Sequence, residues 1–170
     1  MNITSLKYLI ENKFNTNDCG RLTVSNRRIK ELFNFVYVLN EYSGLPIENV
    51  EPESVEDKIE RQRLIKKAKE LYRYFEKDLY TRQAVVQMKY NNDLKLASCL
   101  SLFQFIIRDN KLFLSIFVRS QNYDKNFEYD NNTYSQMYSE LFKILSNKNN
   151  KLKFGEINVK ITSLHRFIES

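Results

Sequence analysis

Two cysteines and a single histidine are the side chains of this sequence with the most specific chemistry. Cys19 and Cys99 lie 80 positions apart and no CxxC pair occurs, which excludes the common zinc and disulfide patterns. A serine hydrolase triad would have to use His165, but no serine lies in a GxSxG motif. No GxxxxGK[ST] or GxGxxG loop occurs either, so a bound phosphate would have to be held by side chains.

Six short segments carry the most informative pattern, through their order and spacing. They are TRQAVVQ (81–87), SCLSLFQF (98–105), RDNKL (108–112), FVRSQN (117–122), YDNNTY (129–134) and SLHRF (163–167). In this order they resemble the thymidylate synthase family, including its deoxycytidylate hydroxymethylases. The intervals from Cys99 to Arg119 and from Ser120 to Asp130 match that family without a gap. The match is clear over residues 81–167 and weak over 1–53.

The resemblance implies covalent chemistry on a pyrimidine ring, with Cys99 as the nucleophile. A thiolate adds to carbon 6 of the ring, which makes carbon 5 nucleophilic. Methylene-tetrahydrofolate would supply a one-carbon group, and a hydride or water would complete methylation or hydroxymethylation. A thiol needs nearby positive charge to ionise at neutral pH, and arginines would provide it. The simpler interpretation of Cys99 is a buried core cysteine in an apolar strand.

The resemblance also implies a set of substrate-binding residues. They are Arg119, Ser120, Asp130, His165, Arg82, Arg21 and Asn122. Arg119 and Ser120 would bind the phosphate, and His165 would contact the sugar. Arg82 would reach the phosphate of a partner subunit. Arg21 would add a further phosphate contact, with Arg27 and Arg28 as competing candidates for the same role.

Asp130 occupies the position at which the family reads the base. A carboxyl group suits the amino group and ring nitrogen of cytosine, whereas an amide suits uracil. The substrate expected from this residue is deoxycytidylate, with deoxyuridylate as the alternative. A register slip of one residue would place Asn131 there instead.

Several positions depart from the family pattern. Leu100, Asn122, Asn126, Glu128 and Phe167 replace a histidine, an aspartate, a glycine, a proline and a tyrosine, and the chain has no tryptophan. The chain also ends at Ser170, before the segment with which the family closes over folate. The candidates for a catalytic glutamate are Glu48, Glu51 and Glu53, none in a recognisable motif.

Three functional hypotheses follow. The first is a divergent, folate-dependent methyltransferase or hydroxymethylase for pyrimidine nucleotides. The second is a nucleotide-binding or regulatory protein on the same fold that has lost catalysis. The third, a nucleic-acid-binding module, is disfavoured because the eleven tyrosines form no aromatic platform.

Size and composition predict a single globular domain over residues 1–170. A net charge of +6 favours anionic partners, although solubility alone also explains it. No run of 18 apolar residues and no signal peptide occur, so we expect a cytoplasmic protein without a membrane segment. The Asn- and Lys-rich composition is typical of an AT-rich genome, such as that of a phage or a low-GC bacterium.

Hydrophobic periodicity predicts the elements that must position these residues. Helices are expected at 5–14, 54–76 and 133–145, with Ser54 as a helix cap. Strands are expected at 84–90, 98–108, 111–119 and 155–168, with a two-residue hairpin turn at Asp109-Asn110. Residues 29–39 fit either a buried strand or a helix, and 121–132 is expected to be a polar loop.

The fold class implied is α/β (α+β): a mixed, mostly antiparallel sheet flanked by helices. Strand 98–108 has apolar residues on both faces, which predicts cover on both sides. Helices would cover one face, and a second subunit would cover the other in a homodimer.

Overall fold

The computed structural model describes residues 3–16, 21–22, 28–39, 54–88 and 99–168. Its elements are α1 (Ile3–Thr16), β1 (Arg21–Leu22), β2 (Arg28–Leu39), α2 (Val55–Glu70), α3 (Tyr72–Lys77), β3 (Val85–Gln87), β4 (Leu100–Arg108), β5 (Lys111–Asn122), α4 (Tyr123–Ser146) and β6 (Lys153–Phe167). None of the helices within these ranges is long and apolar enough to cross a membrane.

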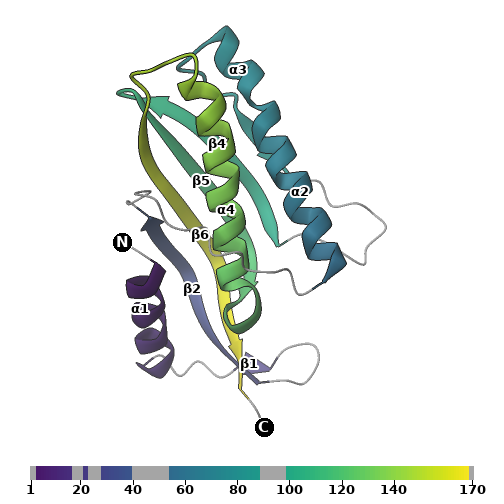
Figure 1. The fold of residues 1–170 in the computed structure, drawn as a ribbon. Helices are drawn as coiled ribbons and strands as arrows, with labels where there is room; N and C mark the ends of the chain where they lie inside the picture. The colour runs from purple at the N-terminus through teal and green to yellow at the C-terminus, as the bar shows by residue number, and fades with distance from the viewer. Residues whose placement is uncertain (1–2, 17–20, 23–27, 40–53, 89–98, 169–170) are drawn as a thin grey trace.

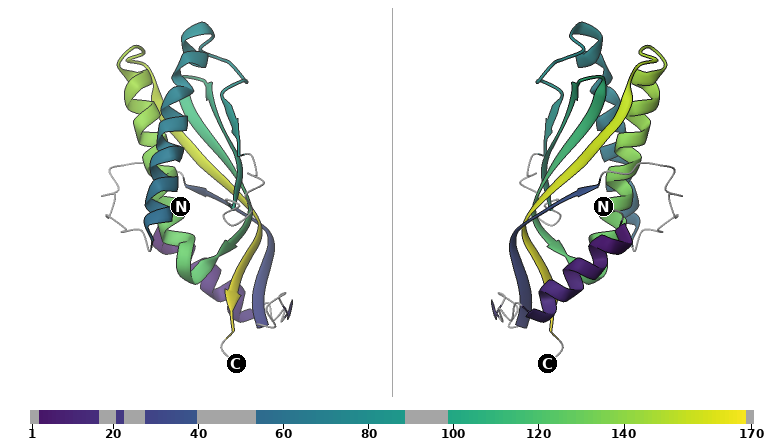
Figure 2. Two further views of the ribbon diagram at one scale, coloured as in Figure 1. Left: turned by 90° about the vertical axis from the view of Figure 1, so that its right-hand side faces the viewer. Right: turned by 90° about the vertical axis from the view of Figure 1, so that its left-hand side faces the viewer.

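The strands form one six-stranded sheet in the order β1-β2-β6-β5-β4-β3. Every pair is antiparallel except β5 with β6. Helices α2 and α4 lie side by side across one face of the sheet, and α1 packs near β2 on the same side (Figures 1 and 2). The predicted mixed, mostly antiparallel sheet flanked by helices is therefore confirmed.

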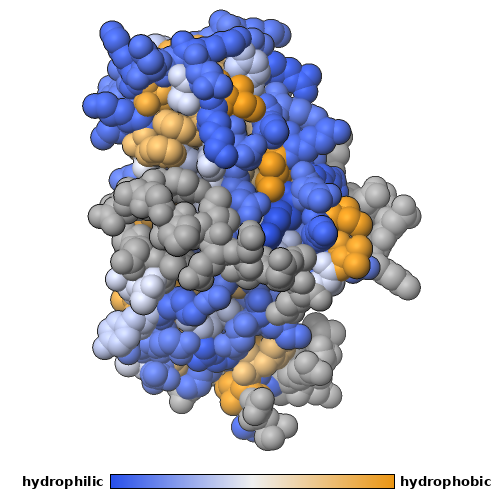
Figure 3. All heavy atoms as spheres, viewed as in Figure 1, coloured by the Kyte–Doolittle hydropathy of each residue, from blue (hydrophilic) through white to orange (hydrophobic). Residues whose placement is uncertain are grey.

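The core lies between this sheet face and the helices. Alternate residues of the central strands are almost fully buried there, including Phe103, Phe105, Ile107, Leu112, Leu114 and Ile116. The intervening residues point to the opposite face, where Phe117 is 41% and Val36 58% exposed. By contrast, hydrophilic side chains dominate the surface over the helices (Figure 3). Among the described residues, no helix covers this outer sheet face, and it exposes several apolar side chains.

Two local signals in the sequence produced the structures predicted from them. Asp109 and Asn110 both have positive φ (50° and 56°), as a two-residue hairpin turn of the primed type requires. The side chain of Ser54 accepts a hydrogen bond from the Asp57 backbone N–H and caps α2. The helix predicted at 54–76 is present, but it divides at Leu71 into α2 and α3.

The ambiguous segment 29–39 is a strand, β2, because its pairing with β6 extends over nearly its whole length. At Asn34 the backbone has a positive φ of 50°, which asparagine tolerates better than most residues. Phe33 is half exposed, whereas Phe35 and Tyr37 are buried against the helices. The segment is therefore a strand because tertiary contacts bury these aromatic rings, and not because of local propensity.

The prediction of a loop at 121–132 is wrong. Strand β5 continues to Asn122, and α4 begins at Tyr123, ten residues before the predicted start. Tyr123 and Phe127 are buried one turn apart, in phase with Tyr134 and Tyr138. The family's glycine and proline are absent from this segment, so nothing breaks the helix.

Candidate functional site

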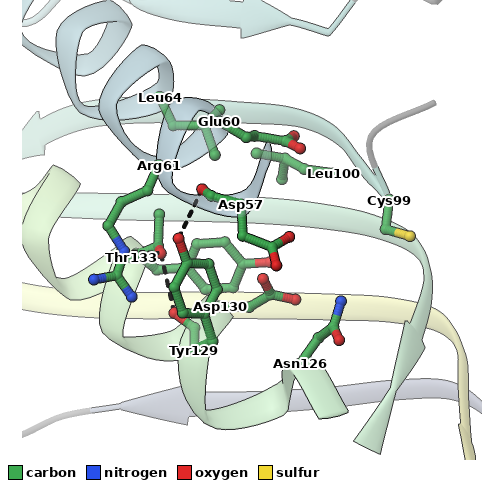
Figure 4. A pocket seen from close by; sticks show the side chains of 11 residues that line it. Asp57, Glu60, Arg61, Leu64, Cys99, Leu100, Asn126, Tyr129, Asp130 and Thr133 are labelled. Atoms are coloured by element: carbon green, nitrogen blue, oxygen red, sulfur yellow. Dashed lines mark hydrogen bonds between the residues drawn. The ribbon is translucent and has the colours of Figure 1, made fainter. Parts of the chain in front are cut away.

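A pocket of about 140 Å³ opens between α2, α4 and the start of β4. Its polar wall consists of Asp57, Glu60 and Arg61 from α2 and Asn126, Tyr129 and Asp130 from α4, with Cys99 at its edge (Figure 4). The volume suits a group the size of a pyrimidine base. It lies below the roughly 300–1,000 Å³ typical of pockets that enclose drug-sized ligands.

Contacts between α2 and α4 hold this wall in place. The Arg61 guanidinium lies 3.9 Å from the centre of the Tyr129 ring, and its Nε donates to Thr133 Oγ1 (3.2 Å). The Tyr129 hydroxyl donates to the backbone oxygen of Asp57 (2.7 Å). Helix α2 is therefore fixed relative to α4 by both stacking and hydrogen bonds.

Cys99 is half-buried directly before β4. Its backbone oxygen accepts a hydrogen bond from the Arg119 N–H (2.9 Å), which joins the start of β4 to β5. Burial raises the pKa of the Cys99 thiol, and the positive charge of Arg119 only partly offsets this. Negative charges on Asp130 and Glu60 raise the pKa further. In the free protein, Cys99 is thus a thiol at neutral pH.

Asp130 is the base-reading candidate that lines the pocket. Its Oδ2 accepts a hydrogen bond from Gln121 Nε2 at 2.6 Å. Burial raises the pKa of Asp130 to about 7, against the lowering effect of this hydrogen bond, and the charges of Glu60 and Asp57 raise it too. A carboxyl group with this pKa is partly protonated at neutral pH.

Asn131, the alternative for this position, faces the core instead. Its Oδ1 accepts from the buried Tyr37 hydroxyl (2.7 Å), and its Nδ2 donates to the Phe127 backbone oxygen (2.7 Å). Both polar atoms of the Asn131 amide are thereby engaged. The helix register therefore places Asp130 in the pocket.

Ser120 and His165 form a second polar group on adjacent strands. Ser120 Oγ lies 3.5 Å from His165 Nδ1. Across β2 and β6, Glu31 pairs with His165, and its carboxylate accepts a hydrogen bond from Ser163 Oγ. Burial lowers the pKa of His165. Neither Ser120 nor His165 lines the pocket, and neither does Arg119, whose backbone N–H and charge nevertheless act on Cys99 at its edge.

Of the remaining predicted residues, Asn122 and Arg82 do not line the pocket. The Asn122 side chain caps α4 by accepting from the backbone N–H groups of Asp124 (3.0 Å) and Lys125 (3.2 Å). Arg82 is exposed before β3, and its backbone oxygen accepts from Gln104 Nε2 (2.8 Å). Arg21 belongs to β1, but its side chain is outside the described atoms, as are Arg27 and the three glutamates proposed for catalysis.

Sequence reasoning assigned no site role to several residues in or beside these two groups. They include Asp57, Glu60, Arg61, Tyr129, Gln121 and Glu31. The charged residues of an amphipathic helix ordinarily form a solvated face. Yet Asp57, Glu60 and Leu64 recur at helical spacing on the edge of the apolar stripe, which is the signal that could have identified them. Within the described ranges, no cluster of three metal-ligating side chains occurs.

Neither a model of a known protein family nor a curated protein sequence matches this chain. Among solved structures, its fold is similar to the crystal structure of thymidylate synthase from T4 phage, with a TM-score of 0.72. The match covers 98% of this chain and 77% of that chain at 14% sequence identity. The chain therefore has a thymidylate synthase-like fold, and identity this low shows the fold alone.

Proposed function

We propose that this protein binds a pyrimidine deoxynucleoside monophosphate, with the base in the pocket between Cys99 and Asp130. One observation carries the proposal. Two residues chosen from the spacing of sequence motifs line a single base-sized pocket on a thymidylate synthase-like fold. A buried structural cysteine would have no reason to lie beside the base-reading candidate.

The state of Asp130 supports cytosine as the preferred base. When protonated, its carboxyl group has one donor and one acceptor oxygen, which pair with the ring nitrogen and amino group of cytosine. The pKa of about 7 makes this form available at neutral pH. We therefore propose deoxycytidylate as the preferred ligand and deoxyuridylate as the weaker one.

Arg119, Ser120 and His165 are proposed to bind the phosphate and sugar. Arg119 and Ser120 lie on β5, and His165 lies on β6. The distance of 3.5 Å between Ser120 Oγ and His165 Nδ1 is long for a hydrogen bond, so the Ser120 hydroxyl can turn toward a ligand instead. Arg82 is proposed to bind the phosphate held by a partner subunit, because it is exposed and does not line the pocket of its own chain. A homodimer packed through the outer sheet face is the arrangement that would use it.

The proposed reaction begins with loss of the Cys99 thiol proton. Glu60 is the candidate acceptor, since it lines the same pocket and its charge acts on Cys99. The sulfur then bonds to carbon 6 of the ring, and the electrons of the 5,6 double bond move toward carbon 5. Methylation or hydroxymethylation at carbon 5 is the proposed outcome. It requires that carbon 5 lose its proton, that a hydride or water complete the new group, and that the bond from carbon 6 to sulfur break to release Cys99 as the thiolate.

Methylene-tetrahydrofolate is the proposed one-carbon donor, and it would supply the group added at carbon 5. The pocket formed by the described residues is too small to hold a folate beside a nucleotide. The chemistry assigned to this chain's own residues therefore ends at the pyrimidine adduct.

Thermal shift and intact-mass spectrometry together test the proposal. Deoxycytidylate at a hundred times its Kd should stabilise the protein by about 2.7 kcal/mol, deoxyuridylate less, and deoxyadenylate not at all. Asp130→Asn should exchange the order of the two pyrimidines. A protein whose melting temperature responds to neither pyrimidine nucleotide would contradict the proposal.

The raised pKa of Cys99 supports a second candidate function, nucleotide binding without catalysis. A thiol that stays protonated is a poor nucleophile. In this case Cys99→Ser would leave the thermal shift unchanged. No covalent adduct or C5-modified nucleotide would form with methylene-tetrahydrofolate present. A mass increase equal to the nucleotide, lost in Cys99→Ser, would decide for the enzyme.

A further inference from the structure

A buried glutamine behind Asp130 has no part in the chemistry described above. Gln121 lies on β5, directly before the cap of α4, and only 1% of its surface is exposed. Its Nε2 donates to Asp130 Oδ2 at 2.6 Å. Its Oε1 is buried without a hydrogen-bond partner among the described residues. An unsatisfied buried amide oxygen costs about 1–3 kcal/mol, which indicates that the amide is retained for its contact with Asp130.

We propose that Gln121 is a positioning residue that makes the two oxygens of the Asp130 carboxyl group unequal and thereby sets the base preference of the pocket. The inference rests on the proposed function, since it concerns how the same pocket distinguishes cytosine from uracil. It requires only that Asp130 contact the base edge, and not that Cys99 react.

A carboxyl group by itself discriminates poorly between these bases. Cytosine presents an amino donor beside a ring-nitrogen acceptor, whereas uracil presents a carbonyl acceptor beside a ring N–H donor. For a base held in one pose, a protonated carboxyl group matches either pattern, depending on which oxygen carries the proton. Discrimination therefore needs something that distinguishes Oδ1 from Oδ2.

The hydrogen bond from Gln121 provides this distinction. An oxygen that accepts an N–H bond is the less favourable place for the proton, so the proton resides on Oδ1 while Oδ2 remains an acceptor. Because Gln121 is buried in a strand, its side chain has little freedom to release Oδ2. The second lone pair of Oδ2 can then accept a hydrogen bond from the cytosine amino group, while Oδ1–H donates a hydrogen bond to the ring nitrogen.

The protonation of Asp130 depends on all charged and titratable groups around it. Within the part of the chain that the structure describes, these are Asp57, Glu60 and Arg61 of α2, Tyr129 and Tyr134 of α4, Cys99 beside β4 and Tyr37 of β2. Gln121 acts on the same carboxyl group from β5, and its hydrogen bond lowers the pKa of Asp130. Loss of that bond should therefore raise this pKa and extend the protonated form to higher pH.

The test compares Gln121→Met and Gln121→Glu with the wild-type protein. Both variants remove the N–H donor at nearly the same side-chain length, and Ile116→Val is the control for a small packing loss in the same strand. The Kd values of deoxycytidylate and deoxyuridylate are measured by calorimetry between pH 6 and pH 9. In parallel, the pKa of Asp130 is followed in the free proteins by carbon-13 NMR of its carboxyl carbon.

We expect the preference for deoxycytidylate over deoxyuridylate to fall about tenfold in Gln121→Met, as loss of one buried hydrogen bond implies. Deoxycytidylate binding should weaken as Asp130 ionises. The midpoint pH of this weakening should be higher in Gln121→Met than in the wild-type protein. If Gln121 had a purely structural role, its replacement would weaken the binding of both nucleotides equally and leave the midpoint pH unchanged. This is the result expected for Ile116→Val.

The two proposals fail in different ways. If the wild-type protein binds neither nucleotide, the proposed function is wrong, and the NMR titration still tests Gln121. An unchanged pKa of Asp130 in the folded Gln121 variants would overturn the inference. So would an unchanged ratio of the two Kd values in a protein that does bind deoxycytidylate.

Discussion

At the scale of single residues, the burial of Cys99 and Asp130 disfavours the charged form of each side chain. Cys99 and Asp130 share one pocket with Asp57 and Glu60, and the negative charges there disfavour ionisation of both Cys99 and Asp130. A site of this kind favours a neutral or hydrogen-bond-donating ligand edge over another anion. The phosphate is accordingly expected outside the pocket, near Arg119.

Asp130 should make the stability of the protein depend on pH. Its folded-state pKa of about 7 exceeds the unfolded value of about 3.9, so the folded state binds more protons between these values. The free energy of unfolding should therefore fall as pH rises from about 4 to about 7 and then level off. Asp130→Asn should remove this trend and stabilise the protein at pH 8.5 by on the order of 2 kcal/mol.

Urea unfolding at pH 5, 7 and 8.5 measures this effect. Asp109→Asn is the control, because it removes a carboxylate from the exposed hairpin turn. The interpretation of Asp130 is wrong if Asp130→Asn and Asp109→Asn show the same pH dependence.

Arg119 should control the reactivity of Cys99. Its charge lowers the pKa of a thiol that burial raises, so its removal should leave less thiolate at any given pH. In a Cys19→Ser background, Arg119→Gln should slow alkylation of Cys99 by iodoacetamide at pH 8 by about threefold. Lys111→Gln, at the far end of the same strand, should have no effect. Equal rates in all three proteins would remove Arg119 from the account of this thiol.

At the scale of elements, the junction of β5 and α4 matters most, because it carries Arg119, Ser120, Gln121 and the cap of the helix that bears Asp130. Asn122 accepts hydrogen bonds from two backbone N–H groups at the start of α4. The geometry assigns it a capping role, whereas the family resemblance predicted substrate contact. Capping is sufficient to explain the residue type at this position.

Asn122→Ala should lower the free energy of unfolding by about 1 kcal/mol, a melting-temperature decrease of roughly 2–4 °C. Asn122→Asp should restore most of this stability, because aspartate also accepts these hydrogen bonds. The Kd for deoxycytidylate, measured by calorimetry, should be nearly the same in both variants. A large loss of affinity in Asn122→Asp alone would instead support direct ligand contact.

Helix α1 is joined to the rest of the fold by Arg166 of β6. The guanidinium makes two hydrogen bonds to the Glu11 carboxylate (2.8 and 2.6 Å) and one to Asp124 (2.8 Å), and it lies over the ring of Tyr123. Arg166→Lys keeps the charge but loses the planar, bidentate geometry.

We expect Arg166→Lys to destabilise the protein by about 1 kcal/mol or more. Backbone amides of α1 should exchange with deuterium faster in this variant than in the wild type, while those of β4 and β5 remain protected. Uniform changes across the chain would show that Arg166 supports the whole fold rather than the attachment of α1.

At the scale of the whole molecule, the helices cover one face of the sheet, and no other described element covers the opposite face. Phe117 lies near the middle of this outer face, between Leu102 of β4 and Lys160 of β6. An apolar sheet face of this kind usually marks an interface. A second copy of this chain, in a homodimer, is its proposed occupant.

Phe117→Asp should convert a dimer to a folded monomer, because it places a charge in the middle of the proposed interface. Light scattering coupled to size-exclusion chromatography measures the mass, and circular dichroism checks the fold. Tyr8→Asp, at a 71% exposed site on α1, is the matched control and should remain dimeric. A wild-type monomer at micromolar concentration would contradict both the dimer and the role of Arg82 in trans.

The sequence by itself determined the features that depend on neighbouring residues. The cap at Ser54, the turn at Asp109-Asn110 and the alternation in β4 and β5 are local, so their chemistry can be read without knowing the partners. The intervals between Cys99, Arg119 and Asp130 also predicted residues that lie in or beside one pocket.

Only the tertiary structure decided what depends on packing between distant segments. It made 29–39 a strand, extended α4 back to Tyr123, and placed Asp57 and Glu60 in the pocket instead of in solvent. It also joined Gln121 to Asp130 and left Cys99 protonated. Burial and the charges of distant neighbours set these properties, and neither is encoded in the spacing of residues along the chain.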